Sequence, residues 1–169
     1  MNFVLPSETA PGPAPINVIN GSRLAYLAVT KVSLVAPAFF SANANGSGAA
    51  AAFLVTVGPD GRRRSQPAFS CGIQPGSCTP NEIELPASGN EARLELYGTG
   101  LRNVTEIRAI SAVIGGVPVP VLYAGAQQQY PGMDQVVVSV PPELKGRGEV
   151  DILLLVDGQP ANSVRVTFR

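Results

Sequence analysis

The last third of the chain holds four runs of residues that have the length and composition of β-strands. Each run has 5 to 9 residues, is rich in Val, Ile and Leu, and is bounded by Gly, Pro, Asp or Asn; the runs cover residues 115–123, 134–140, 149–156 and 164–168. Short apolar runs between turn residues are typical of a small antiparallel β-sandwich rather than of helices. We therefore predict an all-β fold, an Ig-like antiparallel β-sandwich with an additional β-hairpin region at its N-terminus.

The charge balance removes several classes of partner. Lys and Arg number 12, Asp and Glu number 12, and the net charge is zero, so no field attracts nucleic acid or an anionic membrane. No run of about 18 apolar residues is present, which argues against membrane insertion. Only 14% of the residues are charged, while Gly numbers 18 and Pro 16. This composition fits short strands joined by many turns, and a sparsely charged surface is prone to associate with other proteins.

The two cysteines predict a disulfide. Cys71 and Cys78 enclose six residues that include two Gly and one Pro, a loop able to bring the sulfurs together. A zinc site needs further ligands, and the chain has no His and no third Cys. The chain opens without the basic start and apolar core of a signal peptide, so it is either cytoplasmic or a piece of a longer secreted protein. The cysteine pair favours the second alternative, a secreted, extracellular or cell-surface protein.

Residues 1–34 form a first segment of the predicted organisation. Strand-like runs at 2–5, 16–19 and 24–29 are separated by a Pro/Gly turn at 6–15 and by the tight turn Asn20-Gly21. The C-terminus repeats this order, with Asp157-Gly158 as its tight turn, although β-hairpins also share composition without common origin. We interpret residues 1–34 as the terminal strands of a preceding Ig-like copy or as a strand-donating segment.

The rest of the chain is predicted to form two further parts. Residues 35–90 are interpreted as a β-hairpin subdomain with the cysteine loop, because the turn signal at 58–61 separates two strand-like runs. The alanines at 49–52 favour a helix by propensity, but the run that continues to Val57 favours a strand. Residues 91–169 are predicted to form the Ig-like sandwich itself.

Residues that could support catalysis are scarce. The absence of His removes the usual general base and the Ser-His-Asp and Cys-His arrangements. Glu82 with Glu84, and Glu149 with Asp151, each share one face of a strand, as expected of a solvated face. The glycines at 98 and 100 are not followed by a helix start, so they do not open a dinucleotide site. We predict no catalytic residue, no metal site and no cofactor, and therefore no enzyme.

Several short motifs together carry a family resemblance. They are Val35-Ala-Pro-Ala-Phe-Phe-Ser-Ala-Asn43, Gly48-Ala-Ala-Ala-Ala52, Leu96-Tyr-Gly-Thr-Gly-Leu-Arg102, Ile114-Gly-Gly-Val117, Val121-Leu-Tyr-Ala-Gly125, Met133-Asp-Gln-Val136 and Val156-Asp-Gly-Gln159. In number and order they resemble the Solibacter-type uncharacterised C-terminal domain, found at the ends of long secreted bacterial proteins. Residues 91–169 are also similar to the IPT/TIG branch of Ig-like folds. The resemblance implies an extracellular β module and transfers no catalytic residue.

One strand predicts an interaction surface. In the run 151–156, Ile152, Leu154 and Val156 can fill the core face, which leaves Leu153 and Leu155 pointing outward. We expect these leucines to be covered by the 49–57 hairpin, by another copy, or by the N-terminal segment, whose apolar residues are Phe3, Leu5, Ile16 and Val18. Val137 is expected to extend the same patch.

Two classes of function remain for such a chain. The first is a structural or adhesive module of a surface protein or filament-like assembly, which contacts neighbouring Ig-like domains or other copies of itself through strand pairing and apolar contacts. The alternative is a carbohydrate-binding or accessory domain of a secreted enzyme, with a polysaccharide as partner. This alternative has the weaker support, because the chain has no Trp and only four Tyr.

Overall fold

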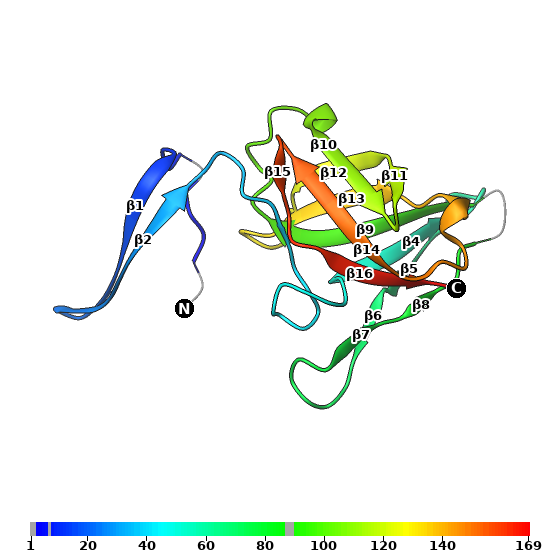
Figure 1. The fold of residues 1–169 in the computed structure, drawn as a ribbon, viewed down its shortest axis with the longest axis horizontal. Coiled ribbons are helices and arrows are strands. Elements are labelled where there is room, and N and C mark those ends of the chain that lie inside the picture. Colours follow the sequence, from blue (N-terminus) through cyan, green and yellow to red (C-terminus); the bar gives the residue numbers. More distant parts are fainter. Residues whose placement is uncertain (1–2, 7, 87–89) are drawn as a thin grey trace. The chain divides into compact units, whose positions relative to one another are not determined.

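The computed structural model describes residues 3–6, 8–86 and 90–169 and divides into two compact units (Figure 1). The smaller unit covers residues 1–34 and the larger unit covers Val35–Arg169. Each unit is described by itself below.

The larger unit contains two mostly antiparallel sheets. The first has the order β11-β10-β14-β16-β8, with β15 beside β14; the strands are β11 (Val117–Val119), β10 (Ile110–Ile114), β14 (Gly148–Val156), β16 (Val164–Phe168), β8 (Glu82–Ile83) and β15 (Gln159–Pro160). The second has the order β12-β13-β9-β4-β5, with β3 beside β9; the strands are β12 (Val121–Ala126), β13 (Asp134–Ser139), β9 (Glu91–Thr99), β4 (Ala52–Val57), β5 (Arg63–Pro67) and β3 (Ala38–Phe39). Two short strands, β6 (Phe69–Cys71) and β7 (Cys78–Pro80), pair with each other, and two 3-10 turns cover Ile107–Ala109 and Pro142–Leu144. The prediction of an all-β sandwich is confirmed.

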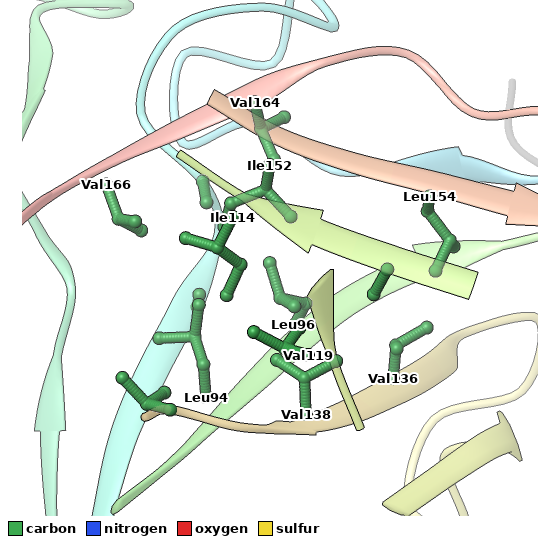
Figure 2. Close-up of a cluster of buried hydrophobic side chains, with 14 of the residues drawn as sticks. Leu94, Leu96, Ile114, Val119, Val136, Val138, Ile152, Leu154, Val164 and Val166 are labelled. Atoms are coloured by element: carbon green, nitrogen blue, oxygen red, sulfur yellow. The ribbon is translucent and has the colours of Figure 1, made fainter. Parts of the chain in front are cut away.

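The core fills the space between the two sheets because alternate residues of each strand point inward. In β14 the buried residues are Ile152, Leu154 and Val156, as predicted. The second sheet contributes alternate residues of β9 and β13, among them Leu94, Leu96, Val136 and Val138. Figure 2 shows the side chains of both sheets meeting in this layer. Each fully buried large apolar side chain contributes roughly 1.5–3 kcal/mol, so this layer, whose residues all belong to the larger unit, stabilises that unit.

The alanine run marks a corner at which the chain passes from one sheet to the other. Ala50 donates its N–H to the carbonyl of Arg165 in β16, and two residues later the chain continues as β4 in the second sheet. Ala49, Ala50 and Ala52 are all buried. The local preference of alanine for helix is overridden because only small side chains fit where the backbone crosses between the sheets.

The predicted boundary near residue 90 does not divide the larger unit. β4 precedes this boundary and pairs with β9, and β8 precedes it and pairs with β16. The reason is that these strands complete both sheets, so residues 35–90 and 91–169 bury their apolar faces in one shared core. The hairpin predicted around residues 58–61 is present as β4–β5, with Val57 opposite Arg63.

The smaller unit is a two-stranded antiparallel hairpin. β1 (Gly12–Asn20) pairs with β2 (Arg23–Val32), and Asn20 lies opposite Arg23 across the tight turn. Gly21 in this turn has φ +61°, which explains the glycine. The prediction of a strand at 2–5 is wrong for residues 3–5, which are outside the strands, and Asn2 lies outside the described residues. The segment 12–15 was predicted as part of a turn but belongs to β1. Its two prolines are compatible with this, because proline is tolerated on an edge strand.

Candidate interaction surfaces

The β1–β2 hairpin has apolar side chains on both of its faces. One face carries Ile16 and Val18, which are half-buried and alternate along β1 as predicted. The opposite face is exposed and carries Ile19, Leu24, Leu27 and Val29. Of the described residues up to Leu34, only Val32 is buried. A two-stranded hairpin without a core is marginally stable in water, so this unit has apolar surface to offer a partner.

The N-terminal residues of the predicted interface are also exposed. Phe3 is 56% exposed and Leu5 is 50% exposed. Both are outside the strands, so they offer side-chain contacts rather than backbone pairing.

The two edges of the hairpin differ in their ability to pair with another strand. Pro13 and Pro15 lie opposite Lys31 and Val29 in the register. Proline has no N–H to donate. The hydrogen-bond ladder between β1 and β2 is therefore complete only if these residue pairs lie at positions whose backbone N–H and C=O groups point away from the partner strand. The outer edge of β1 therefore lacks two donors and is a poor template for a further strand. The outer edge of β2 has no proline and keeps the outward N–H groups of Val29 and Lys31.

Leu153 and Leu155 lie on the outer face of the first sheet, as the alternation in β14 predicted. They are 52% and 42% exposed. Their neighbours across the strands are Val113, Ser111 and Pro160. Of the three covers expected from the sequence, the 49–57 hairpin is ruled out, because β4 and β5 belong to the other sheet.

Val137 does not extend this patch. It lies on β13 and pairs with Tyr123 of β12 and Glu95 of β9, all in the second sheet. Runs of valine do not reveal from sequence which of two sheets a strand joins, and this is the reason that the prediction failed.

Four edge strands end the two sheet orders of the sandwich: β11 and β8 in the first sheet, and β12 and β5 in the second. Three of them carry charged residues or proline, which natural proteins use to protect edges. β5 contains Arg63, Arg64 and Pro67, and β11 contains Pro118. β8 is acidic: Glu82 and the following Glu84 are both exposed, while Ile83 between them is buried.

The disulfide predicted from the sequence is present. The sulfurs of Cys71 and Cys78 are 2.02 Å apart, and the two residues face each other at the end of the β6–β7 pair. Inside the loop, the Ser77 hydroxyl donates to the Gln74 carbonyl at 2.6 Å, and the Gly72 N–H donates to the Ser77 carbonyl at 3.0 Å. Ile73 is fully exposed at the end of this closed loop.

The carboxylate pair of β14 shares one basic partner. Arg165 contacts Glu149 and Asp151 at 3.1 Å each across the β14–β16 pair. The alternation with half-buried Val150 is the one expected of a solvated strand face. In the described part of the chain, no group of three or more His, Cys, Asp or Glu side chains is placed to hold a metal ion. Within residues 3–6, 8–86 and 90–169, no helix has the length and hydropathy that crossing a bilayer requires.

A polar groove on the outer face of the second sheet was not singled out by sequence reasoning. It has a volume of about 380 Å³ and is lined by Tyr123, Ala126, Gln127, Gln128, Gln129, Gln135 and Val137. The only signal in the sequence was three consecutive glutamines shortly after a tyrosine in an apolar strand. Without knowledge of the neighbouring strand, such glutamines indicate no more than an ordinary loop.

Comparison of this chain with protein-family models, with curated proteins and with solved structures gave no match. The fold and the surfaces define the chain as a two-sheet β-sandwich preceded by a hairpin unit.

Proposed function

We propose that this chain is a non-catalytic, extracellular structural or adhesive module that joins other copies of itself through its N-terminal hairpin. The observation that carries the proposal is the β1–β2 hairpin itself, which has no core, exposes apolar residues on both faces and keeps one open edge. Such an element gains stability by adding to the sheet of a partner, because the new strand pair satisfies backbone groups and covers apolar side chains.

The donor strand in this proposal is β2. Its outer edge has free donors, whereas Pro13 and Pro15 limit the outer edge of β1. A two-stranded unit with one open edge can pair with only one further strand. The hairpin therefore contacts its partner through β2 alone.

Charge selects the acceptor among the sandwich edges. The hairpin carries Arg23 and Lys31 and no acidic residue between positions 12 and 32. Two hairpins would therefore repel each other, and β5, with Arg63 and Arg64, would repel the hairpin as well. The edge at β8 presents Glu82 and Glu84 and is complementary to it. We assign this edge as the acceptor on a second copy.

A contact between the hairpin of one copy and the sandwich of another is heterologous. Contacts of this type continue head to tail, into a ring or a filament, unless two copies exchange their hairpins reciprocally, which closes a two-fold dimer. The disulfide is consistent with an oxidising environment, and the low charge content of the chain favours association. The exposed Leu153 and Leu155 give the sandwich a further apolar surface for neighbours in such an assembly.

Removal of residues 1–32 tests the proposal. We expect the full chain to form assemblies whose mass, measured by light scattering, grows with protein concentration. The truncated chain is expected to be monomeric and to melt near the temperature of the full chain, since the sandwich has its own core. A full chain that is monomeric at all concentrations, or a truncated chain that associates as before, would contradict the proposal.

Charge reversal locates the contact. The variants R23E/K31E and E82K/E84K should each assemble less than the original chain, because like charges then face each other. An equal mixture of the two variants should recover assembly, since each acidic hairpin then meets a basic edge. If both variants and their mixture assemble as the original chain does, the contact uses a different edge and the β8 assignment is overturned.

A further inference from the structure

The outer face of the second sheet gathers aromatic and amide side chains from several strands. Residues opposite each other in antiparallel strands share a face. The register places Tyr123 opposite Val137, and Gly125 opposite Gln135, which is in turn opposite Tyr97. Burial raises the pKa of the Tyr97 phenol, and the nearby Glu95 carboxylate and Tyr130 phenol raise it further. Three of the four tyrosines of the chain therefore lie near one surface.

The hydroxyl end of the Tyr123 ring is fixed against its own strand. Its hydroxyl donates to the carbonyl of Ala126 at 2.7 Å. A Cβ added to Gly125 would lie 3.2 Å from the hydroxyl oxygen and 3.5 Å from Cζ of the ring. The ring thus covers Gly125, which has no side chain to displace it. Tyr123 is nevertheless 41% exposed, so part of its side chain is open to solvent.

Amide groups border this ring. Gln127, Gln128, Gln129 and Gln135 line the groove beside Tyr123. The side-chain oxygen of Gln127 accepts the N–H groups of Gln129 and Tyr130 at 2.8 and 3.0 Å, which fixes the loop that forms one wall. Each glutamine side chain provides both donors and an acceptor, and none of the lining residues is charged.

These features select the chemistry of a ligand. A flat, pre-positioned aromatic ring binds the apolar C–H face of a sugar, and amides bind hydroxyl groups that both donate and accept hydrogen bonds. The lining offers no counter-charge to an anionic or cationic ligand. The groove volume of about 380 Å³ lies within the range of roughly 300–1,000 Å³ for small-molecule sites.

We infer that the Tyr123 groove binds one unit of a neutral oligosaccharide, stacked on the Tyr123 ring and hydrogen-bonded by the surrounding glutamines. The inference goes beyond the proposed assembly and uses no residue of it, because the groove lies on a face of the second sheet whereas assembly uses β2 and the edge at β8. An adhesive module would then attach to a glycan on one surface while it joins its neighbours by another.

The test uses the full chain and calorimetric titration with cellohexaose, xylohexaose and laminarihexaose, with oligogalacturonate as the anionic comparison. At least one neutral hexasaccharide is expected to bind, and oligogalacturonate is expected not to. Tyr123→Ala should weaken binding by about tenfold through loss of the stacking ring. Gly125→Ala should also weaken it, since a methyl group there displaces the ring, while Tyr123→Phe should keep most of the affinity.

Leu122→Ala is the matched control, because Leu122 is an exposed neighbour on the same strand outside the groove lining. It should bind as the original chain does, and the thermal midpoint of every variant establishes that it is folded. Absence of binding to all three neutral hexasaccharides overturns the inference. Binding that folded Tyr123→Ala and Gly125→Ala retain in full also overturns it. Because R23E/K31E leaves the groove intact, that variant should bind sugar normally even if assembly is lost, which separates failure of this inference from failure of the proposed function.

Discussion

The Nε of Arg102 donates a hydrogen bond to Oδ1 of Asp134 at 2.7 Å, and this pair ties the turn after β9 to the start of β13. Asp134 is only 1% exposed, and its other oxygen, Oδ2, accepts the backbone N–H of Leu101 at 2.9 Å. Arg102 also donates to the carbonyl of Met133. The buried carboxylate therefore satisfies a backbone donor and a guanidinium at once, which is the condition under which a buried charge is tolerated.

Replacement of Asp134 by alanine should lower the free energy of unfolding by about 2–4 kcal/mol, because it leaves the Leu101 N–H without its acceptor and Arg102 without its partner. Arg102→Met should cost less, since Asp134 then still accepts the Leu101 N–H and Arg102 is partly exposed. Urea denaturation measures both values. An equal loss in the two variants would show that the ion pair, rather than the backbone contact, dominates.

Gly100 is expected to tolerate no side chain. It has φ +83°, and an added Cβ would lie 1.9 Å from the carbonyl oxygen of Ala36. Gly116 has a similar φ of +81° but open space around its Cα, so it is the matched control. Gly116→Ala should cost about 1 kcal/mol from backbone strain alone. Gly100→Ala should cost at least about 2 kcal/mol more because the segment that carries Ala36 must move away. Equal thermal shifts would contradict this account.

The Cys71–Cys78 bond should contribute on the order of 2 kcal/mol, chiefly because it restricts the unfolded chain. The double variant C71S/C78S should therefore unfold at lower urea concentration and keep its fold. Mass spectrometry without reduction should find the bond in exported protein. Two free thiols there would contradict the extracellular assignment as well as the bond.

Mutation of adjacent leucines of β14 should change the stability by very different amounts. Leu153→Ser and Leu155→Ser alter exposed side chains, so stability should change by no more than about 0.5 kcal/mol. Leu154→Ala empties a position in the core and should cost about 2–5 kcal/mol. If the two serine variants also reduce association, the outer face of β14 is part of the contact between copies. A large loss of stability in either serine variant would contradict the placement of these residues on the outer face.

Local patterns in the sequence predicted the parts of the fold that depend on local physics. Alternation in β14 identified Ile152, Leu154 and Val156 as core residues, and turn residues located the β4–β5 hairpin and the Asn20-Gly21 turn. The spacing of Cys71 and Cys78 predicted their bond. These features need only period, turn chemistry or loop length.

Features that depend on distant strands could not be predicted. The sheet that Val137 joins, and the corner at Ala50, depend on partners far away in the sequence. The Tyr123 groove is local in sequence, because its walls come from β12, β13 and the loop between them, but the irregular register that places Tyr123 opposite Val137 could not be predicted. That β8 ends a sheet, the feature on which we propose it as the acceptor, could be recognised only when the strand order was known.

We propose that β2 adds to the sheet of another copy through its outer edge, and the substitution Val29→Pro probes that edge itself. Val29 lies opposite Pro15, at a position whose N–H faces away from β1, so Val29→Pro removes an outward donor while it keeps the hairpin ladder. Val29→Thr keeps both the donor and the β-branched shape and serves as its control. Sedimentation velocity should show concentration-dependent assembly for the original chain and for Val29→Thr, and a monomer for Val29→Pro. Assembly by folded Val29→Pro that equals that of Val29→Thr would contradict the claim.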